Sequence, residues 1–165
     1  MKLIWTKSNL PLSVVIRAIT GEDCSHFAFV FESAAQSLVF QSNLLGTNPE
    51  FYKKLSATWG FEVVHQIDYP MTIDEEDIAW DIIVDNNTET GYNFLGAFYL
   101  GWRYILKRLF KIPLPAKNAW SQKHTMFCDQ IYKILNQLKD SRLPKIDVMN
   151  GMDTPHAVYM KVKGS

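Results

Sequence analysis

The stretch SHFAFVFE, residues 25–32, alternates large aromatic residues with smaller or polar ones. Successive side chains of a β-strand point to opposite faces of the sheet, so this alternation predicts a strand with one bulky apolar face. That face carries Phe27, Phe29 and Phe31. The opposite face begins with His26, which we expect near the end of a hairpin, where its side chain can reach a cleft.

A second apolar run, SLVFQS at residues 37–42, follows after a short turn of polar and small residues. Two such runs predict a β-hairpin. A turn of even length pairs Ala28 with Gln41 and His26 with Asn43, which places both amides on the face of the histidine. Gln41 is then a diagonal neighbour of His26, within reach of the imidazole. A turn of odd length would put both amides on the other face.

The other elements are predicted from periodicity and capping signals. Further strands are expected at residues 2–6, 61–67 and 156–163. Ser13 can cap a helix that Gly21 ends, and Thr72 and Glu75 stand in capping-box relation at the start of another. Thr125 can cap a helix over residues 126–139. Helices and strands are segregated without a regular βαβ alternation, which favours a single α+β domain over a doubly wound sheet.

The composition excludes several classes of protein. The chain has 165 residues, of which 47% are apolar and 21% charged, so a disordered or fibrous protein is excluded. The 17 basic and 17 acidic residues cancel, whereas a nucleic-acid binder usually carries an excess of basic charge. The two cysteines, Cys24 and Cys128, are too few for a disulfide scaffold or a four-cysteine zinc site.

No segment has the pattern of a signal peptide or a transmembrane helix, so we expect a cytoplasmic protein. The apolar stretch near the N-terminus, residues 3–5, is too short for a signal peptide. Residues 92–110 are strongly apolar but uncharged only as far as Trp102, which is too short to cross a bilayer. They predict a buried or amphipathic helix of the core. An interfacial helix with peripheral membrane contact is the alternative, because a basic end follows the aromatic residues. That end carries Arg103, Lys107, Arg108 and Lys111.

Cys128 is the candidate nucleophile. With Thr125 as the N-cap, it becomes the third residue of its helix, next to unpaired backbone N–H groups and the positive end of the helix dipole. Both features favour the thiolate, which is the reactive form. In the alternative interpretation the thiol simply packs, since it shares an apolar stripe with Ile131 and Leu135.

The four histidines differ in their suitability as a base for this thiol. His26 begins a strand near the end of the hairpin, and His124 lies just outside the predicted helix cap as a local neighbour of Cys128. His65 lies inside a strand pattern beside Val63 and Val64, which predicts a structural role. His156 starts the last predicted strand, where we expect an exposed edge position.

Four stretches resemble the circularly permuted papain-like cysteine hydrolases, which belong with the NlpC-like and lecithin:retinol acyltransferase-like enzymes. IRAITGEDCSHFAFVF, residues 16–31, is similar to the opening histidine motif of that family, and LVFQSN, residues 38–43, to its next strand. TMFCDQIYKIL, residues 125–135, is similar to its late cysteine helix, and TPHAVYMKV to its closing strand. The order of histidine first and cysteine later is the permuted one.

The resemblance implies a papain-like α+β fold in which Cys128 is the nucleophile, His26 the base and Gln41 the orienting group. The third position commonly holds His, Glu, Asn or Asp in the family, so a glutamine is a departure. An amide can orient an imidazole through its carbonyl, but it cannot neutralise an imidazolium. Asn43 is a second candidate for this position, and Cys24 is a rival nucleophile without a predicted helix terminus.

The function expected from these residues is that of a cysteine hydrolase, of amidase or peptidase type, that forms a thioester acyl-enzyme. The alternatives are a thiol acyltransferase or lipid hydrolase of the same fold, and a binding or structural protein with a degenerate triad. The substrate would be a small molecule, a peptide or a lipid, with no nucleic acid. We expect no cofactor and no metal, because no pair of His or Cys has a spacing such as CxxC or HxxxH.

Overall fold

The centre of the fold is a five-stranded antiparallel sheet with the strand order β4-β3-β2-β1-β5. The computed structural model describes residues 1–32, 37–43, 46–69, 71–87, 91–92, 94–112, 125–126 and 154–164. The strands of the sheet are β1 (Lys2–Lys7), β2 (His26–Glu32), β3 (Ser37–Asn43), β4 (Gly46–Phe51) and β5 (Glu62–Asp68). Two short strands, β6 (Gly91–Tyr92) and β7 (Thr125–Met126), form a separate parallel pair.

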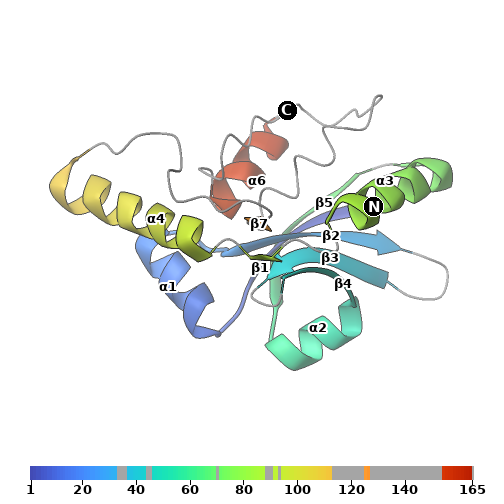
Figure 1. The fold of residues 1–165 in the computed structure, drawn as a ribbon, viewed down its shortest axis with the longest axis horizontal. Helices are drawn as coiled ribbons and strands as arrows, with labels where there is room; N and C mark the ends of the chain where they lie inside the picture. The colour runs from blue at the N-terminus through green and yellow to red at the C-terminus, as the bar shows by residue number, and fades with distance from the viewer. Residues whose placement is uncertain are drawn as a thin grey trace.

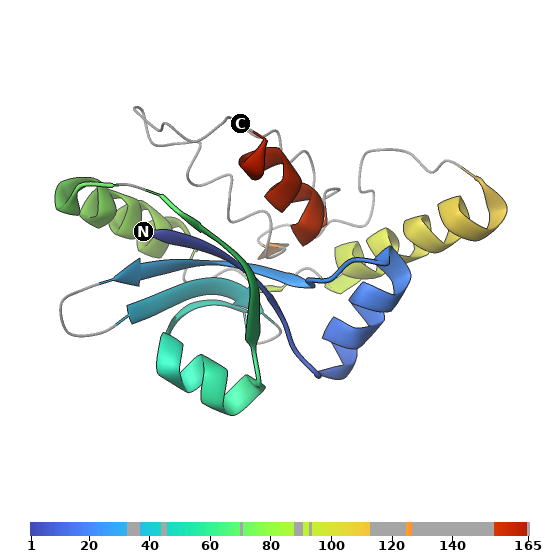
Figure 2. The same ribbon diagram turned by 180° about the vertical axis from the view of Figure 1, so that it is seen from behind.

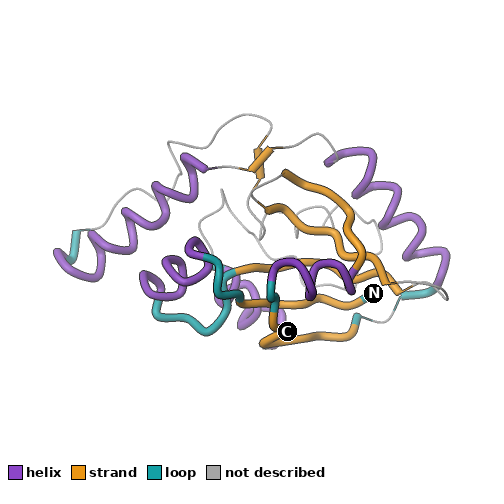
Figure 3. Tube along the Cα trace, turned by 90° about the horizontal axis from the view of Figure 1, so that it is seen from below, coloured by secondary structure: helices purple, strands orange, loops and turns teal. Residues whose placement is uncertain are grey.

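Helices lie around this sheet rather than between its strands (Figure 3). They are α1 (Pro11–Thr20), α2 (Tyr52–Trp59), α3 (Ile73–Asn87), α4 (Phe94–Ile105), the π-helical η1 (Leu106–Phe110) and α6 (Pro155–Lys163). Seen in Figures 1 and 2, α2 covers one face of the sheet and α6 the other. An antiparallel sheet with helices outside it is an α+β fold, as the sequence predicts. The papain-like arrangement stays a prediction.

The two faces of the sheet bury different side chains. Trp5, Phe27 and Phe29 belong to the larger core cluster, which packs against α3 and α6. Ala28 and Val30 belong to a smaller cluster on the other face, next to α2. The predicted division of β2 into a bulky phenylalanine face and a less bulky face is therefore confirmed.

The pairing of β2 with β3 follows the register expected for an even-length turn. Ala28 lies opposite Gln41, and Phe29 lies opposite Phe40. The edge strand β4 and the helix α2 were not predicted. The sequence of β4, GTNPEF, contains glycine, asparagine and proline, which are depleted in strands. Proline is tolerated here because β4 is an edge strand, where one side of the backbone needs no partner.

The helix α1 begins at Pro11, not at the predicted cap Ser13. Ser13 points inward: its Oγ accepts a hydrogen bond of 3.0 Å from the Ser8 backbone N–H and lies 2.6 Å from the Oγ of Ser25. A buried serine hydroxyl in this position anchors the helix to the start of β2 rather than capping its end. Gly21 ends the helix in the left-handed conformation, with φ of 74°, as predicted.

The tail forms the helix α6 and not the predicted strand. Thr154 caps it, because its Oγ1 accepts a hydrogen bond of 3.1 Å from the Ala157 backbone N–H. Val158 and Val162 are buried four residues apart, which is a helical spacing. The alternation of the tail also fits a strand, but the cap and a proline in the first turn favour the helix. His156 consequently lies in a first helical turn and not on a strand edge.

Thr125 is not the N-cap of a helix that begins at Met126. Both residues form β7 and pair in parallel with Gly91 and Tyr92 of β6. Their backbone groups serve the strand ladder, and a β-branched threonine suits that conformation. The prediction that Thr125 caps a helix starting at Met126 is therefore wrong. Cys128 itself lies outside the described residues.

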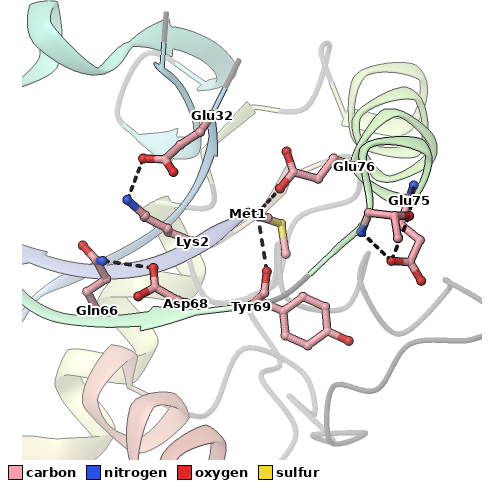
Figure 4. A network of polar contacts seen from close by, with 9 residues as sticks. Met1, Lys2, Glu32, Gln66, Asp68, Tyr69, Glu75 and Glu76 are labelled. Carbon is pink, nitrogen blue, oxygen red and sulfur yellow. Dashed lines mark hydrogen bonds and ion pairs between the residues drawn. The ribbon is translucent and has the colours of Figure 1, made fainter. Parts of the chain in front are cut away.

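The predicted capping box of α3 is confirmed, and a polar network next to it joins α3 to the first strand (Figure 4). The Thr72 backbone N–H donates to the Glu75 carboxylate at 2.8 Å, and the Glu75 backbone N–H donates to Thr72 Oγ1 at 3.3 Å. The amino group of Met1 forms an ion pair with Glu76 and donates to the carbonyl of Tyr69. These contacts fix the edge of the sheet where β1, β5 and α3 meet.

The apolar helix α4 packs across α1 with one side only. At the crossing, a Cβ atom added to Gly101 would lie 3.6 Å from the Cδ1 atom of Ile19, so the two helices are in close contact. Tyr99 is buried, whereas Phe98 is 69% exposed and Trp102 48% exposed. The expectation of a core helix thus holds for one side of α4. None of the described helices combines the length and apolar character needed to cross a membrane.

Candidate active site

His26 is held at the first position of β2 by its neighbours in sequence and space. The Ser25 backbone N–H donates to the carbonyl of Thr6 at 3.0 Å, and Thr6 is also the residue paired with His26 across the sheet. The hydroxyl of Ser25 contacts Ser13 of α1. The ring of Phe61 packs against the imidazole with centroids 5.6 Å apart. The histidine is therefore fixed by a strand, a helix and an aromatic ring together.

Gln41 contacts His26 as the hairpin register predicts. The His26 Nε2 atom lies 2.8 Å from the Gln41 Oε1 atom, and the glutamine side chain is fully buried. This contact is the diagonal cross-strand pair expected from the even-length turn. The hydrogen bond needed for an orienting amide is thus present between these two residues.

A third residue, Glu50 of β4, completes the hydrogen-bonded chain. The Gln41 Nε2 atom donates to the Glu50 Oε2 atom at 2.9 Å. A carboxylate only accepts hydrogen bonds, so it holds the NH2 group of the glutamine toward itself and leaves the carbonyl facing His26. The sequence did not indicate Glu50, because the strand that carries it was not predicted.

This chain determines which nitrogen of His26 carries the proton. The Gln41 carbonyl can only accept, so Nε2 is the donor and Nδ1 keeps its lone pair. Burial lowers the pKa of His26 to about 4, although the hydrogen bond to Gln41 opposes this shift. The imidazole is consequently neutral near pH 7, and its Nδ1 atom can accept a proton.

The remaining predicted residues are not brought into this group. Cys24 is fully buried in the larger core cluster, where a substrate cannot reach it. Asn43 ends β3, where it pairs with Gly46, and its side chain lies outside the described residues. Cys128 and His124 also lie outside them. The described site therefore consists of His26 with its hydrogen-bonded neighbours Gln41 and Glu50.

Two further histidines and an aspartate meet at a second place. Asp23 accepts hydrogen bonds from His65 at 2.9 Å and from His156 at 3.0 Å. The ring nitrogen of His65, for which the sequence predicts a structural role, has a hydrogen-bond partner in Asp23. The three residues are the described group whose donor atoms could hold a metal ion.

Comparison of the chain with protein-family models, with curated proteins and with solved structures finds no match in any of the three.

Proposed function

We propose that the chain is a cysteine hydrolase, of amidase or peptidase type, with Cys128 as nucleophile, His26 as base and Gln41 as orienting group. The observation that carries this proposal is the hydrogen-bonded chain from His26 through Gln41 to Glu50. An imidazole with one fixed tautomer, whose Nδ1 atom keeps its lone pair, is what nucleophilic catalysis requires of a base. The resemblance of residues 125–135 to a cysteine helix supplies the nucleophile.

In the proposed reaction His26 Nδ1 takes the thiol proton of Cys128, and the sulfur attacks the carbonyl carbon of the substrate. The tetrahedral intermediate collapses to a thioester, while the imidazolium gives its proton to the leaving amine. His26 then takes a proton from water, and the resulting hydroxide attacks the thioester. The products are a carboxylic acid and the regenerated thiol.

Glu50 supplies the negative charge that a glutamine at the third position lacks. Gln41 itself carries no charge to stabilise the imidazolium that forms in each step. The Glu50 carboxylate lies directly behind the amide and polarises its carbonyl toward His26 through the shared hydrogen bonds. Glu or Asp supplies a negative charge at the third position in some proteins of the resembled family; here that charge lies one residue further from His26.

A lipid-directed activity of the same thiol is the second candidate, because α4 exposes apolar side chains. Leu95, Phe98 and Trp102 are exposed along this helix, and basic residues follow in η1. An exposed apolar stripe with a basic end is typical of an element that lies in a membrane interface. A thiol acyltransferase or lipid hydrolase would use such an element to reach its substrate.

The proposal is tested by the rate at which Cys128 reacts with iodoacetamide, followed by mass spectrometry of the labelled peptides. Near pH 7 we expect Cys128 to react at least about tenfold faster than an ordinary thiol, because the neutral His26 accepts the thiol proton as the sulfur attacks. The buried Cys24 in the same chain is the unreactive internal reference. His26→Ala should slow the labelling of Cys128 to the rate of an ordinary thiol.

His65→Ala is the matched control, since it removes a histidine of the same sheet that does not contact Gln41. It should leave the labelling rate of Cys128 unchanged. Slow labelling that His26→Ala does not alter would contradict the proposed enzyme. The chain would then be a binding or structural protein with a degenerate triad.

A further inference from the structure

Asp23, His65 and His156 come together from three distant parts of the chain. Asp23 lies between α1 and β2, His65 on β5 and His156 in the first turn of α6. One donor atom of each residue, two imidazole nitrogens and a carboxylate oxygen, lies within 4.8 Å of the others. None of the local spacings in the sequence indicates this group, because the fold alone assembles it.

We infer that these three side chains bind a divalent transition-metal ion, of which Zn²⁺ fits the donors best. Two imidazoles and one carboxylate form a ligand set of nitrogen and oxygen that suits zinc. Calcium and magnesium prefer sites made of oxygen donors alone. The proposed ligand atoms are His65 Nε2, His156 Nδ1 and one carboxylate oxygen of Asp23.

The spacing of the donors is close to that of a tetrahedral site. Ligand bonds of about 2.1 Å to zinc place neighbouring ligand atoms about 3.4 Å apart. The two nitrogens now lie 2.9 and 3.0 Å from the oxygens of Asp23, so small side-chain rotations admit the ion. Each imidazole binds through the nitrogen that now donates to Asp23, and its remaining proton then sits on the other ring nitrogen.

The neighbouring side chains support such a site. The ring of His65 stacks on Tyr159 with centroids 4.0 Å apart and an interplanar angle of 7°, which fixes its orientation. The Asp23 carboxylate accepts a hydrogen bond from each imidazole, so the donor atoms of the three side chains already face one another.

Glu22, the residue before Asp23, provides a second and independent observation. Its Oε1 atom accepts a hydrogen bond of 2.6 Å from Thr154, whereas its Oε2 atom is buried without a hydrogen-bond partner in the described part of the chain. A cation bound at the neighbouring Asp23 would compensate the charge of this unpartnered carboxylate oxygen.

The proposed ion is separate from the candidate active site. Trp5 pairs directly with Phe27 and with His65, so all three share one face of the sheet, and His26 points to the other. The side chains of Asp23, His65 and His156 are 49%, 21% and 31% exposed, which leaves solvent access for a water molecule as fourth ligand. The inference does not depend on the proposed hydrolase, and the ion would tie α6 to the sheet.

The test is a titration of the chelator-treated full chain with Zn²⁺ alone, followed by calorimetry. We expect one ion per chain and a higher melting temperature when the ion is present, because a ligand that binds the native state stabilises it. Asp23→Asn keeps the size of the side chain and should weaken binding by about tenfold or more, since it removes the charged ligand. Asp74→Asn, at an exposed position of α3, is the matched control.

Titration with Co²⁺ distinguishes these ligands from the two thiols. We expect visible absorption bands of a four-coordinate ion without the near-ultraviolet band of a cobalt–thiolate bond, and no change in Cys128→Ser. Circular dichroism should show that Asp23→Asn is folded. Equal affinities of the wild type, Asp23→Asn and His156→Ala would overturn the inference, as would a cobalt–thiolate band or the absence of saturable binding at one equivalent.

Discussion

Gln41, the proposed orienting group, is uncharged, so the orientation of its amide depends on the Glu50 carboxylate to which it donates a hydrogen bond. Gln41 can face His26 with either end, and among the described residues Glu50 selects the carbonyl. Glu50→Gln should therefore allow the amide of Gln41 to turn and should lower the rate of Cys128 labelling by about tenfold. This factor corresponds to the loss of one hydrogen bond to a charged group, roughly 1.5 kcal/mol.

Two further measurements separate positioning of His26 from a merely structural role of Glu50. Glu50→Asp should restore part of the labelling rate, and nitrogen NMR of His26 should report a change of tautomer in Glu50→Gln. Glu62→Gln, on the opposite edge of the sheet, is the matched control. A folded Glu50→Gln with an unchanged rate and an unchanged tautomer would show that Glu50 does not act through Gln41.

The pKa of His26 makes stability dependent on pH. Its pKa falls from 6.5 to about 4 on folding, so the unfolded chain binds the proton more readily than the native chain. The neutral imidazole contributes its full stability above pH 6.5, and this contribution is lost as pH falls toward 4. Between about pH 7 and pH 4.5 we expect the free energy of unfolding to fall by about 2 kcal/mol through this group.

Urea unfolding of the wild type and of His26→Gln at both pH values measures this contribution. The substituted side chain does not titrate, so its loss of stability over the same interval should be smaller by about 2 kcal/mol. Equal losses in both proteins would mean that His26 has an ordinary pKa in the folded chain.

The predictable part of the site is the part that depends on local pairing. His26 and Gln41 belong to one hairpin, and the parity of a single turn determines that they meet. Glu50 belongs to β4, whose glycine, asparagine and proline have a low propensity for strands, so the sequence does not predict this strand. Pairing with β3 forms the strand despite that low propensity. Asp23, His65 and His156 are separated by long stretches of chain, so no local pattern could bring them together.

At the level of elements, α6 shows how two periodicities compete. The apolar residues of the tail fit an alternating strand and a helical stripe equally, and burial against the sheet selects the helix. The signals that could have decided in advance were Thr154 as a cap and the proline that follows it. The same helix brings His156 to Asp23. Because the tail was expected to be a strand, the sequence did not predict the group of Asp23, His65 and His156.

Thr154→Ala tests the cap of α6. The substitution removes the hydrogen bond from the Ala157 backbone N–H and the bond to Glu22, so we expect a loss of about 1–2 kcal/mol in the free energy of unfolding. Thr154→Ser keeps a hydroxyl and should lose less than half of that amount. Unchanged stability of Thr154→Ala in urea unfolding would contradict the capped helix.

In the whole molecule, the candidate active site and the proposed zinc site lie on opposite faces of the sheet. The face toward α2 carries His26 and Gln41, and the face toward α6 carries the bulky core and His65. The hydrolase activity and the zinc site can therefore be tested independently of each other. A chelator should leave the labelling rate of Cys128 unchanged, while His26→Ala should leave Zn²⁺ binding unchanged.

The exposed side of α4 decides between a soluble amide and a lipid as substrate. Phe98 is 69% exposed, so Phe98→Ser removes little buried surface and should not lower stability. For the amidase that we propose, turnover of a soluble peptide amide should be the same in wild type and Phe98→Ser, and anionic vesicles should not increase it. A lipid-directed enzyme would instead sediment with these vesicles and would turn over a lipid ester faster in their presence. Phe98→Ser would weaken both the sedimentation and the turnover, because the apolar stripe of α4 would supply the contact with the membrane interface. Since the chain has no net charge, attraction of the whole molecule to an anionic surface cannot substitute for that contact.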